Sequence, residues 1–282
     1  MEKRNNLEEP VVSIIIAAFN SANTIRMALD SVLNQSYQKW ECIIVDGGSS
    51  DGTISILELY SNIDSRFKYK SEPDKGIYDA FNKGWQRASC EWILYLGSDD
   101  LMMPDGLKLV MESESPADCI YADHISTNCK GRRVHYNKHN NISSFKGIMI
   151  SHQAMLMRRQ LIKRLGGFNT SFRVCGDFEL VQRAVKAGAT FEYHPGYLTI
   201  FQSGGTCRKL FVIRLKEEYK IKLEYSGKSV ILCRFNYFFR FIKESYYFVK
   251  TPIANFLLDI FNHFQPSKAI TVLMLMKNET KI

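Results

Sequence analysis

The sequence has no closely spaced pair of cysteines. Seven cysteines are spread along its 282 residues without a CxxC motif, namely Cys42, Cys90, Cys119, Cys129, Cys175, Cys207 and Cys233. An odd number of dispersed cysteines argues against a disulfide framework and against a structural zinc site. We therefore expect a protein of a reducing compartment.

Long apolar runs are also missing. The N-terminal segment MEKRNNLEEP is polar and acidic, and it lacks the apolar core of a secretory signal. No stretch reaches the ~18 uncharged apolar residues that a membrane-spanning helix needs. Hydrophobic residues nevertheless make up 45% of the chain, which suffices for a sizeable core. These features predict a cytoplasmic protein with one large domain, or with one domain and an appendage.

Most of the chain has no net charge. Residues 1–207 contain 23 Lys and Arg against 23 Asp and Glu, whereas residues 208–282 contain 14 against 6 and so hold the whole formal charge of +8. The second segment also contains 14 of the aromatic residues. We predict a neutral domain in residues 1–207, followed by a basic, aromatic, helical tail in residues 208–282.

The first hundred residues alternate between strand and helix patterns. Apolar runs predict strands at 11–17, 40–45, 67–70 and 92–96, and apolar residues at helical spacing predict helices at 24–35 and 76–88, with another opened by DGGSSDGT. This alternation predicts an α/β fold with a mostly parallel sheet and helices on both faces. Further on, we expect a helix at 177–187 and a pair of strands near 190–202. In such sheets, ligands bind outside the carboxyl ends of the strands.

Two adjacent carboxylates, Asp99 and Asp100, follow the strand EWILYL. They would repel each other unless a cation or hydrogen-bond donors lay nearby. Mn²⁺ or Mg²⁺ commonly binds one or two carboxylates together with waters and phosphate oxygens, and stabilises a leaving diphosphate there. The alternative is that one of the two residues caps the helix after Pro104 or shapes the turn.

Several segments, taken in order, resemble a known enzyme family. VSIIIAAFN, VDGGSSDGT, SEPDKGIYDAFNKG, YLGSDD, SHQAMLMRR, GGF, CGDFEL and FQSGGT together cover about residues 11–207. The set resembles family-two inverting glycosyltransferases of the GT-A fold, most closely bacterial enzymes that build colanic acid, O-antigen and related surface polysaccharides. The resemblance implies a Rossmann-like catalytic domain that uses a nucleoside-diphosphate sugar and Mn²⁺ or Mg²⁺, the metal being bound by the acidic pair.

The resemblance also assigns nucleotide-binding residues near the strand ends. Ala17 and Phe19 match positions that line the base, Asp46 matches the carboxylate that reads it, and Asp99 belongs to the same nucleotide-binding set. A carboxylate at Asp46 accepts a hydrogen bond from an imide N–H, which favours uracil. Asp46 alternatively caps the following helix, although Asp51 is better placed for that role.

The segment EPDKGIYDAFNKG contains Asp74, Gly76, Asp79 and Asn82, which the resemblance assigns to the donor pocket. Asp79 and Asn82 are three residues apart and hence neighbours on a helix. Gly76 is alternatively a hinge at the helix start, and Asp79 a surface charge. The family commonly has a basic residue in ARN-type segments here, where this chain reads YDAFN. Many relatives also read DSDD where this chain reads GSDD.

Acceptor-side residues come from the second half of the match. Asp177 matches the catalytic base, which removes the acceptor hydroxyl proton during attack on the anomeric carbon. Asp177 alternatively caps its helix, with Glu179 reinforcing the first turn, and the two roles are compatible. His152 and Gln153 match polar positions that orient acceptor groups, although His152 is equally explained as a structural histidine. Residues 204–206 form either a loop over the donor or a plain turn.

The tail is rich in both charge and aromatic rings. Residues 208–250 contain 11 Lys and Arg, 4 Asp and Glu and many Phe and Tyr, which is typical of amphipathic helices in a membrane interface. The alternative is a helical cap that packs its aromatics on the preceding domain. We predict no nucleic-acid partner, because no recognised motif for one accompanies the charge.

These patterns together predict an inverting glycosyltransferase on the inner face of the cell membrane. Its predicted donor is a UDP-sugar and its predicted acceptor a polyprenyl-diphosphate-linked glycan. One alternative uses a GDP-sugar such as GDP-fucose. Another is a non-catalytic scaffold that binds a sugar nucleotide, since a fold alone does not fix function.

Overall fold

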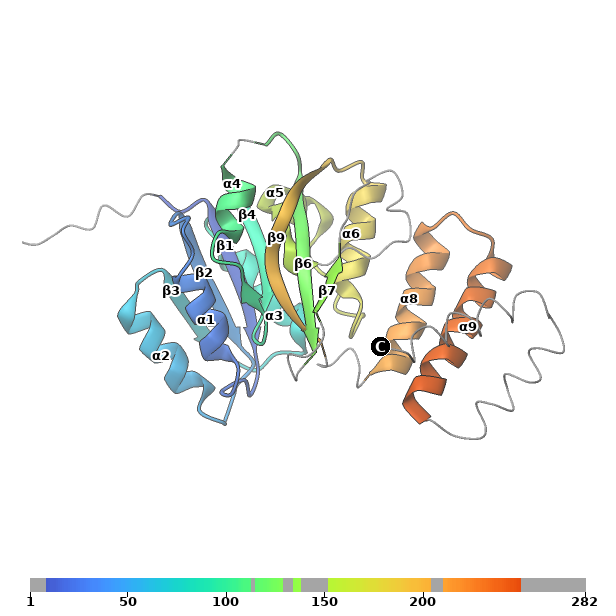
Figure 1. Ribbon diagram of the computed structural model, residues 1–282, viewed down its shortest axis with the longest axis horizontal. Coiled ribbons are helices and arrows are strands. Elements are labelled where there is room, and N and C mark those ends of the chain that lie inside the picture. Colours follow the sequence, from blue (N-terminus) through green and yellow to red (C-terminus); the bar gives the residue numbers. More distant parts are fainter. Residues whose placement is uncertain (1–8, 113–114, 129–133, 138–151, 204–209, 250–282) are drawn as a thin grey trace, which may run out of the picture. The chain divides into compact units, whose positions relative to one another are not determined.

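The computed structural model describes residues 9–112, 115–128, 134–137, 152–203 and 210–249. The chain divides into two compact units, Met1–Gly227 and Lys228–Ile282. The first unit is a mixed α/β domain (Figure 1). The second unit contains helix α9 (Val230–Val249), and the remainder of the predicted tail, residues 250–282, lies outside the described residues.

One sheet organises the first unit. Its strands are β1 (Val12–Ala18), β2 (Trp40–Asp46), β3 (Phe67–Ser71), β4 (Trp92–Gly97), β5 (Leu101–Met102), β6 (Cys119–Asn128), β7 (Val134–Asn137), β8 (Met155–Arg158) and β9 (Phe191–Ser203). Their order is β3-β2-β1-β4-β8-β6-β9-β5, with β7 beside β6. The first four in this order are parallel, as the sequence predicts. β8 is antiparallel to both of its neighbours, so the sheet is mixed.

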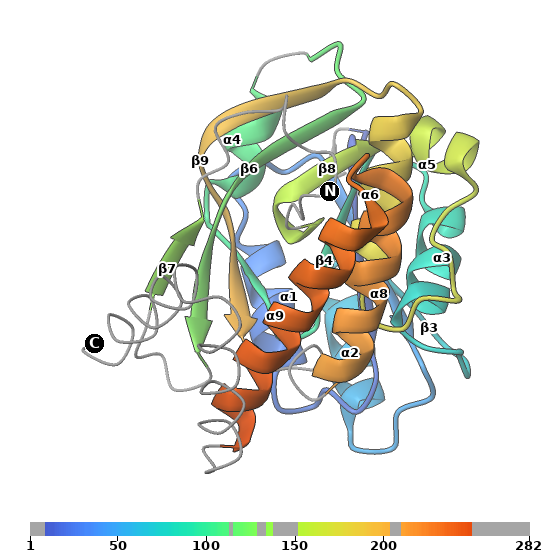
Figure 2. The same ribbon diagram turned by 90° about the vertical axis from the view of Figure 1, so that its right-hand side faces the viewer.

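Helices cover both faces of this sheet. They are α1 (Ile25–Leu33), α2 (Thr53–Ile63), α3 (Ile77–Arg87), α4 (Gly106–Met111), α5 (Arg159–Leu165), α6 (Gly176–Lys186) and α8 (Phe211–Tyr225). Ile14 and Ile16 of β1 pack toward α1, α2 and α4, whereas Ile15 between them packs toward α3, α5 and α6. Figure 2 shows α3 and α5 on one side of the sheet and α4 on the other. The alternation of side chains along β1 therefore explains the three layers.

The predicted strand pair near 190–202 is a single strand, β9. β9 runs parallel to β6, and between the pairs Tyr121–Tyr193 and Asp123–Tyr197 it contains extra residues that β6 does not match. The segment HPG, residues 194–196, lies in this irregularity. Gly196 there has a φ of +146°, so the strand absorbs the interruption as a bulge.

Helix α8 belongs to the first unit, although its sequence lies in the predicted tail. Ile221 is fully buried in the same hydrophobic cluster as residues of α6. The Glu217 carboxylate accepts hydrogen bonds from the backbone N–H groups of Arg173, Val174 and Cys175 at 2.7, 2.9 and 2.9 Å. These donors lie at the amino end of α6, where backbone N–H groups have no partner within the helix. α8 thus stabilises the start of α6.

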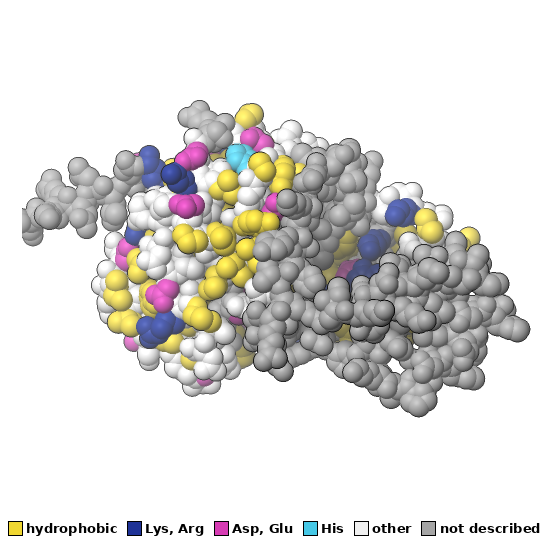
Figure 3. Space-filling view, viewed as in Figure 1, with side chains coloured by type: hydrophobic (Ala, Val, Ile, Leu, Met, Phe, Trp, Pro, Cys, Tyr) yellow, Lys and Arg dark blue, Asp and Glu magenta, His cyan; other side chains and the backbone are white. Residues whose placement is uncertain are grey.

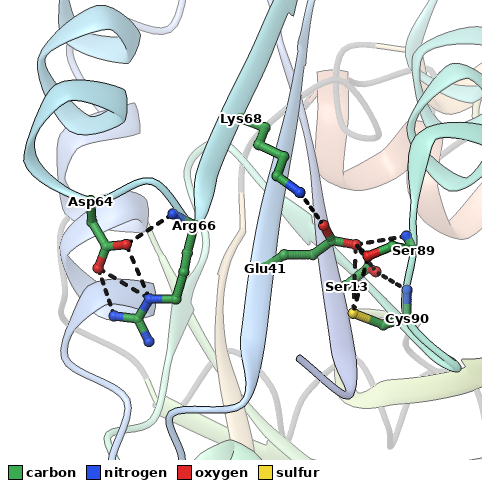
Figure 4. Close-up of polar contacts among 7 residues, drawn as sticks. All are labelled: Ser13, Glu41, Asp64, Arg66, Lys68, Ser89 and Cys90. Carbon is green, nitrogen blue, oxygen red and sulfur yellow. Dashed lines mark hydrogen bonds and ion pairs between the residues drawn. The ribbon is translucent and has the colours of Figure 1, made fainter. Parts of the chain in front are cut away.

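A buried carboxylate fastens the amino-terminal edge of the sheet (Figure 4). Glu41 at the start of β2 accepts hydrogen bonds from the Ser13 hydroxyl (2.7 Å), the Ser89 N–H and hydroxyl (2.7 and 2.8 Å) and Lys68 (2.8 Å). Burial by itself opposes ionisation, but these donors together lower the pKa of Glu41 to about 2. Glu41 therefore joins β1, β2, β3 and the segment before β4 as a charged group.

Candidate active site

The carboxyl ends of β1, β2 and β4 meet at one edge of the sheet, and hydrogen bonds join the loops that follow them. The backbone N–H of Asn20 donates to the Ser49 hydroxyl at 2.7 Å, and the Asn20 side-chain oxygen accepts from the Ser50 N–H at 3.0 Å. The hydroxyls of Ser21 and Ser98 lie 3.0 Å apart. These contacts hold three separate loops in one arrangement.

Asp46 lies buried beneath this edge, at the end of β2. Its carboxylate accepts hydrogen bonds from the N–H groups of Gly48 (3.1 Å) and Ser49 (2.9 Å). The hydroxyls of Ser49 and Ser71 donate to it as well. The carboxylate therefore shapes the turn after β2. Its contact with a nucleotide base stays a prediction.

A ring and a carboxylate flank the glycine that follows Asp46. Phe19, which follows β1, is 63% exposed, whereas Ala17 within β1 is half-buried. A Cβ atom on Gly47 would lie 2.6 Å from Asp74 Oδ2 and 3.2 Å from Phe19 Cδ2. Asp74 Oδ1 accepts the N–H of Gly76 at 2.8 Å, which fixes the carboxylate at the start of α3. Only a glycine at position 47 leaves this space open.

The two polar residues of α3 predicted to line the donor pocket have separate surroundings. Asp79 accepts the backbone N–H of Lys75 at 3.0 Å and lies 3.4 Å from Lys83 Nζ. Asn82 bonds both backbone groups of Phe168, at 2.9 Å through its NH₂ and at 2.8 Å through its oxygen. Asn82 thus ties α3 to the turn after α5. Their contact with a donor stays a prediction.

Both carboxylates that follow β4 turn back over Gly97. A Cβ atom there would lie 2.6 Å from Asp100 Oδ2 and 3.0 Å from Asp99 Oδ1. Burial, with a smaller contribution from Asp99, raises the pKa of buried Asp100 to about 7. Burial also raises the pKa of Asp99. The glycine that replaces the first Asp of the DSDD pattern thus leaves room for the two remaining carboxylates.

The carboxylates of Asp99 and Asp100 suit a divalent ion whose remaining ligands come from a bound substrate. Within the part of the chain that the structure describes, no three His, Cys, Asp or Glu side chains are grouped to hold a metal. Mg²⁺ commonly takes one or two carboxylates and completes its coordination with waters and substrate phosphates. The raised pKa of Asp100 indicates that ionising the pair is costly until a cation lies nearby.

A second titratable pair consists of His152 and Asp177. His152 Nδ1 lies 2.7 Å from Asp177 Oδ2. The Tyr78 hydroxyl lies 3.0 Å from Asp177 Oδ1 and 2.6 Å from the carbonyl oxygen of Val174. Burial opposes ionisation of Asp177. The charge of His152 and the hydrogen bonds from His152, the Phe178 N–H and the Tyr78 hydroxyl outweigh burial and lower the pKa of Asp177 overall. Asp177 is therefore a carboxylate at neutral pH.

The topology of the sheet brings the two pairs to the same edge. His152 begins the short 3-10 turn η2 (His152–Ala154), which leads into β8. Because β8 is antiparallel to β4, this turn lies at the carboxyl end of β4, from which Asp99 and Asp100 extend. The charge of His152 favours ionisation of Asp100, as expected for neighbouring groups. Gln153 is half-buried in the same turn. The predicted loop at 204–206 lies outside the described residues.

Sequence analysis did not identify two aromatic residues of α3 that contact the His152–Asp177 pair. Tyr78 bonds Asp177, and the fully buried Phe81 ring lies with its centroid 6.1 Å from that of His152. Phe81 stands in YDAFN, the segment that departs from the basic pattern of the family. Their spacing of three residues predicts one shared buried face. It does not predict that the face meets an imidazole.

Comparison with known proteins identifies the family. The model of glycosyl transferase family 2 matches residues 13–188, more than half of the chain. The chain belongs to glycosyl transferase family 2. This confirms the family that the ordered motifs predicted. Among family relatives, the PGL/p-HBAD biosynthesis glycosyltransferase of Mycobacterium tuberculosis is 35% identical over 178 residues, covering 60% of this chain and 68% of that protein.

Solved structures share the fold of this glycosyl transferase family 2 chain. Mannosyltransferase PcManGT from Pyrobaculum calidifontis, in complex with GDP-Man and Mn²⁺, aligns with a TM-score of 0.66 and 16% identity, covering 98% of this chain and 81% of its own. S. aureus TarS 1–349 in complex with UDP aligns with a TM-score of 0.56 and 18% identity, covering 79% and 68%. At these identities the likeness concerns the fold.

Proposed function

We propose that this family 2 glycosyltransferase moves a sugar from a nucleoside-diphosphate donor, a UDP-sugar, to a lipid-linked glycan with inversion at the anomeric carbon. We also propose that its domain is of the GT-A type. The observation that carries the proposal is the placement of two pairs, His152 with Asp177 and Asp99 with Asp100, at one edge of the sheet. The first suits removal of a proton from an acceptor, and the second suits a metal-bound diphosphate.

On the acceptor side, inversion needs a single base opposite the leaving group. The negative charge that this base requires comes from the Asp177 carboxylate, because the lowered pKa of Asp177 keeps it ionised. His152 is bonded to it and shares its site. Gln153 lies in the same turn as His152, and we propose that it binds acceptor hydroxyl groups.

On the donor side, the exposed ring of Phe19 offers a surface on which a base can stack. The Asp74 carboxylate beside it can accept an imide N–H, and Asp46 supports the loop between them. Ala17, Gly76, Asp79 and Asn82 complete the proposed pocket. Asp99 and Asp100 would hold Mn²⁺ or Mg²⁺, which supplies positive charge to the leaving diphosphate.

The donor can be tested by thermal stability. Ligands that bind only the folded protein raise its melting temperature. We expect UDP and a UDP-sugar to do so with Mn²⁺ and to lose the effect with EDTA, and we expect slow hydrolysis of the matching donor. Stabilisation by GDP alone would redirect the proposal to a GDP-sugar such as GDP-fucose. Binding without hydrolysis or transfer would support the scaffold alternative.

The proposed acceptor is a polyprenyl-diphosphate-linked glycan of a bacterial surface polysaccharide, such as colanic acid or O-antigen, reached at the inner face of the membrane. The second unit supports this part. In α9 the side chains of Ile231, Phe235 and Phe238 recur at helical spacing and are exposed, Ile231 by 81%, with Arg234 between them. An apolar stripe beside basic residues suits the interface of an anionic membrane. None of the helices that the structure describes has the length and apolarity to cross a bilayer.

The distribution of charge also supports a membrane role for the second unit and a catalytic role for the first. On the face of the first unit seen in Figure 3, Lys and Arg side chains lie beside Asp and Glu side chains, so neither sign dominates. The tail holds the excess of positive charge. We expect the full chain to sediment with anionic liposomes, less so at high salt, and a chain ending at Gly227 to stay in solution while still hydrolysing donor. Equal sedimentation of the two forms would reject the membrane role of the second unit.

A further inference from the structure

We propose that Tyr78 positions the base of the transfer reaction: its hydroxyl holds the Asp177 carboxylate in the orientation that receives the acceptor proton. This inference rests on the proposed function, in which Asp177 is the base. It gives an acceptor-side role to a residue of the segment EPDKGIYDAFNKG, which otherwise belongs to the proposed donor pocket.

Groups at the amino end of α6 contact the Tyr78 hydroxyl. This hydroxyl lies 2.6 Å from the carbonyl oxygen of Val174 and 3.0 Å from Asp177 Oδ1, so its single hydrogen serves two acceptors. Its oxygen accepts a hydrogen bond from the backbone N–H of Asp177. Burial and the charge of Asp177 raise the pKa of Tyr78 well above its usual value, so the group stays a donor. Tyr78 therefore contacts both the backbone and the side chain of the proposed base.

The ring of Tyr78 has little room to move. The residue is 5% exposed, and the Phe168 ring stacks on it with centroids 5.4 Å apart and an interplanar angle of 22°. A Cβ atom on Gly176 would lie 2.8 Å from the ring atoms Cδ2 and Cε2 of Tyr78. The absence of a side chain at position 176 thus lets the ring approach the turn that carries Asp177.

Helix α3 fixes the backbone of Tyr78. The turn before it is closed by the 2.8 Å hydrogen bond from the Gly76 N–H to Asp74 Oδ1. Asn82, one turn further along α3, bonds both backbone groups of Phe168 and so keeps the stacking ring in place. A side chain on a packed helix holds its neighbours more precisely than one on a loop. The Tyr78 hydroxyl therefore has a fixed place from which to orient Asp177.

The Asp177 carboxylate turns about a soft terminal torsion, so its orientation depends on the donors around it. His152 Nδ1 lies 2.7 Å from Oδ2, the Tyr78 hydroxyl lies 3.0 Å from Oδ1, and the Phe178 N–H also bonds the group. A carboxylate offers about four lone-pair sites, so three donors leave one for an acceptor hydroxyl. Loss of the Tyr78 hydroxyl would free Oδ1 to turn away from the acceptor.

The step balances as follows for an acceptor R–OH. The oxygen forms a bond to the anomeric carbon while its proton passes to the Asp177 carboxylate. The bond between the anomeric carbon and the diphosphate oxygen breaks, and its electron pair leaves with the nucleoside diphosphate. The Asp177 carboxylic acid then releases its proton to water. The Tyr78 hydroxyl keeps its own proton throughout.

The test is a double-mutant cycle between Tyr78→Phe and Asp177→Asn, with kcat for transfer as the readout. Tyr78→Phe removes only the hydroxyl, and we expect kcat to fall roughly 10- to 100-fold, as for a misplaced catalytic group. Its affinity for UDP with Mn²⁺, measured by calorimetry, should be unchanged. Asp177→Asn should lower kcat by roughly 100-fold or more. Because Tyr78 acts through the carboxylate, adding Tyr78→Phe to Asp177→Asn should lower kcat no further.

Tyr95→Phe is the matched control. The Tyr95 ring also packs on Phe168, with centroids 4.9 Å apart. Its buried hydroxyl has no hydrogen-bond partner among the residues that the structure describes. The same atom is thus removed from the same aromatic cluster without any contact to Asp177, and kcat should be unchanged.

A hydroxyl that serves only the fold gives different results. Equal losses of kcat from Tyr78→Phe in the wild-type and Asp177→Asn backgrounds would overturn the proposal, and so would a Tyr78→Phe protein as active as Tyr95→Phe. A Tyr78→Phe protein that no longer binds UDP would also overturn it, since the hydroxyl would then be needed for folding. Absence of transfer by the wild type with every donor tested would instead reject the proposed function itself.

Discussion

The backbone N–H of Gln202 donates a 2.9 Å hydrogen bond to the carboxylate of Asp100. It joins the end of β9 to the acidic turn after β4. This bond favours ionisation of Asp100, but burial outweighs it and raises the pKa of Asp100 to about 7. The folded state therefore binds this proton more tightly than the unfolded chain does. Stability of the metal-free protein should fall as the pH rises from about 4 to about 7.

Asp100→Asn tests this relationship. The variant should lack that loss and, in EDTA at pH 8, should exceed the wild type in free energy of unfolding by on the order of 2 kcal/mol. Mn²⁺ with UDP should stabilise the wild type alone, and the variant should lose transfer. Urea unfolding at pH 5 and pH 8 provides the measurement. The same pH dependence in both proteins would contradict the burial argument.

Glu41→Gln should destabilise the fold without touching the proposed site. The lowered pKa of Glu41 means that its contribution is present above about pH 4.5 and is lost as the pH falls toward 2. The expected cost at pH 7 is about 2 kcal/mol, since several donors lose a charged acceptor. Lys68→Met is the control. Its exposed ammonium group should contribute under about 1 kcal/mol. Equal losses in the two variants would show that the exposed ion pair, rather than the buried network, is what matters.

Gly97→Ala should disturb the acidic pair directly, because the added methyl group would lie 2.6 Å from Asp100 Oδ2 and 3.0 Å from Asp99 Oδ1. We expect a loss of about 1–3 kcal/mol in stability together with weaker Mn²⁺-dependent binding of UDP. Gly84→Ala is a matched clash in the core, with Ile15 Cγ2 at 2.3 Å from the new Cβ. Calorimetry should find its UDP affinity unchanged once folding is corrected for. Loss of affinity in both variants would remove the special role of Gly97.

Glu217→Gln tests the support that α8 gives to α6. Three backbone N–H groups would lose a charged acceptor, and we expect a cost of about 1–3 kcal/mol. Transfer should fall as well, because Asp177 lies in the first turn of α6. Glu224, exposed on the same helix, provides a control through Glu224→Gln. Thermal unfolding and transfer rates that match the wild type in Glu217→Gln would show that α6 starts correctly without this cap.

The parallel half of the sheet was predictable because its signals are local. The apolar runs of β1, β2 and β4 are buried on both faces, and each ends in polar residues that must then share one edge. The position of Asp99 and Asp100 follows from this pattern. So does the membership of glycosyl transferase family 2, since the ordered motifs lie at these strand ends.

The contacts of the second half were not predictable from the same signals. The approach of His152 to Asp177 depends on β8 running antiparallel beside β4, which no local period encodes. The inward turn of the Asp46 carboxylate depends on Ser71, which comes from a different strand. Composition led us to include the sequence of α8 in the tail. Composition cannot show that Ile221 packs with residues of α6 or that Glu217 bonds the N–H groups at its start.

The cap that Glu217 places on α6 has a consequence for exchanging parts between relatives. The family match ends at residue 188, whereas the acceptor for the N–H groups before Asp177 comes from residue 217. A chimera that grafts only the matched segment into another glycosyltransferase would carry Asp177 on a helix whose first turn has lost its anion. A functional graft has to extend through α8. The segment that this site needs in order to fold is therefore longer than the segment that the family model matches.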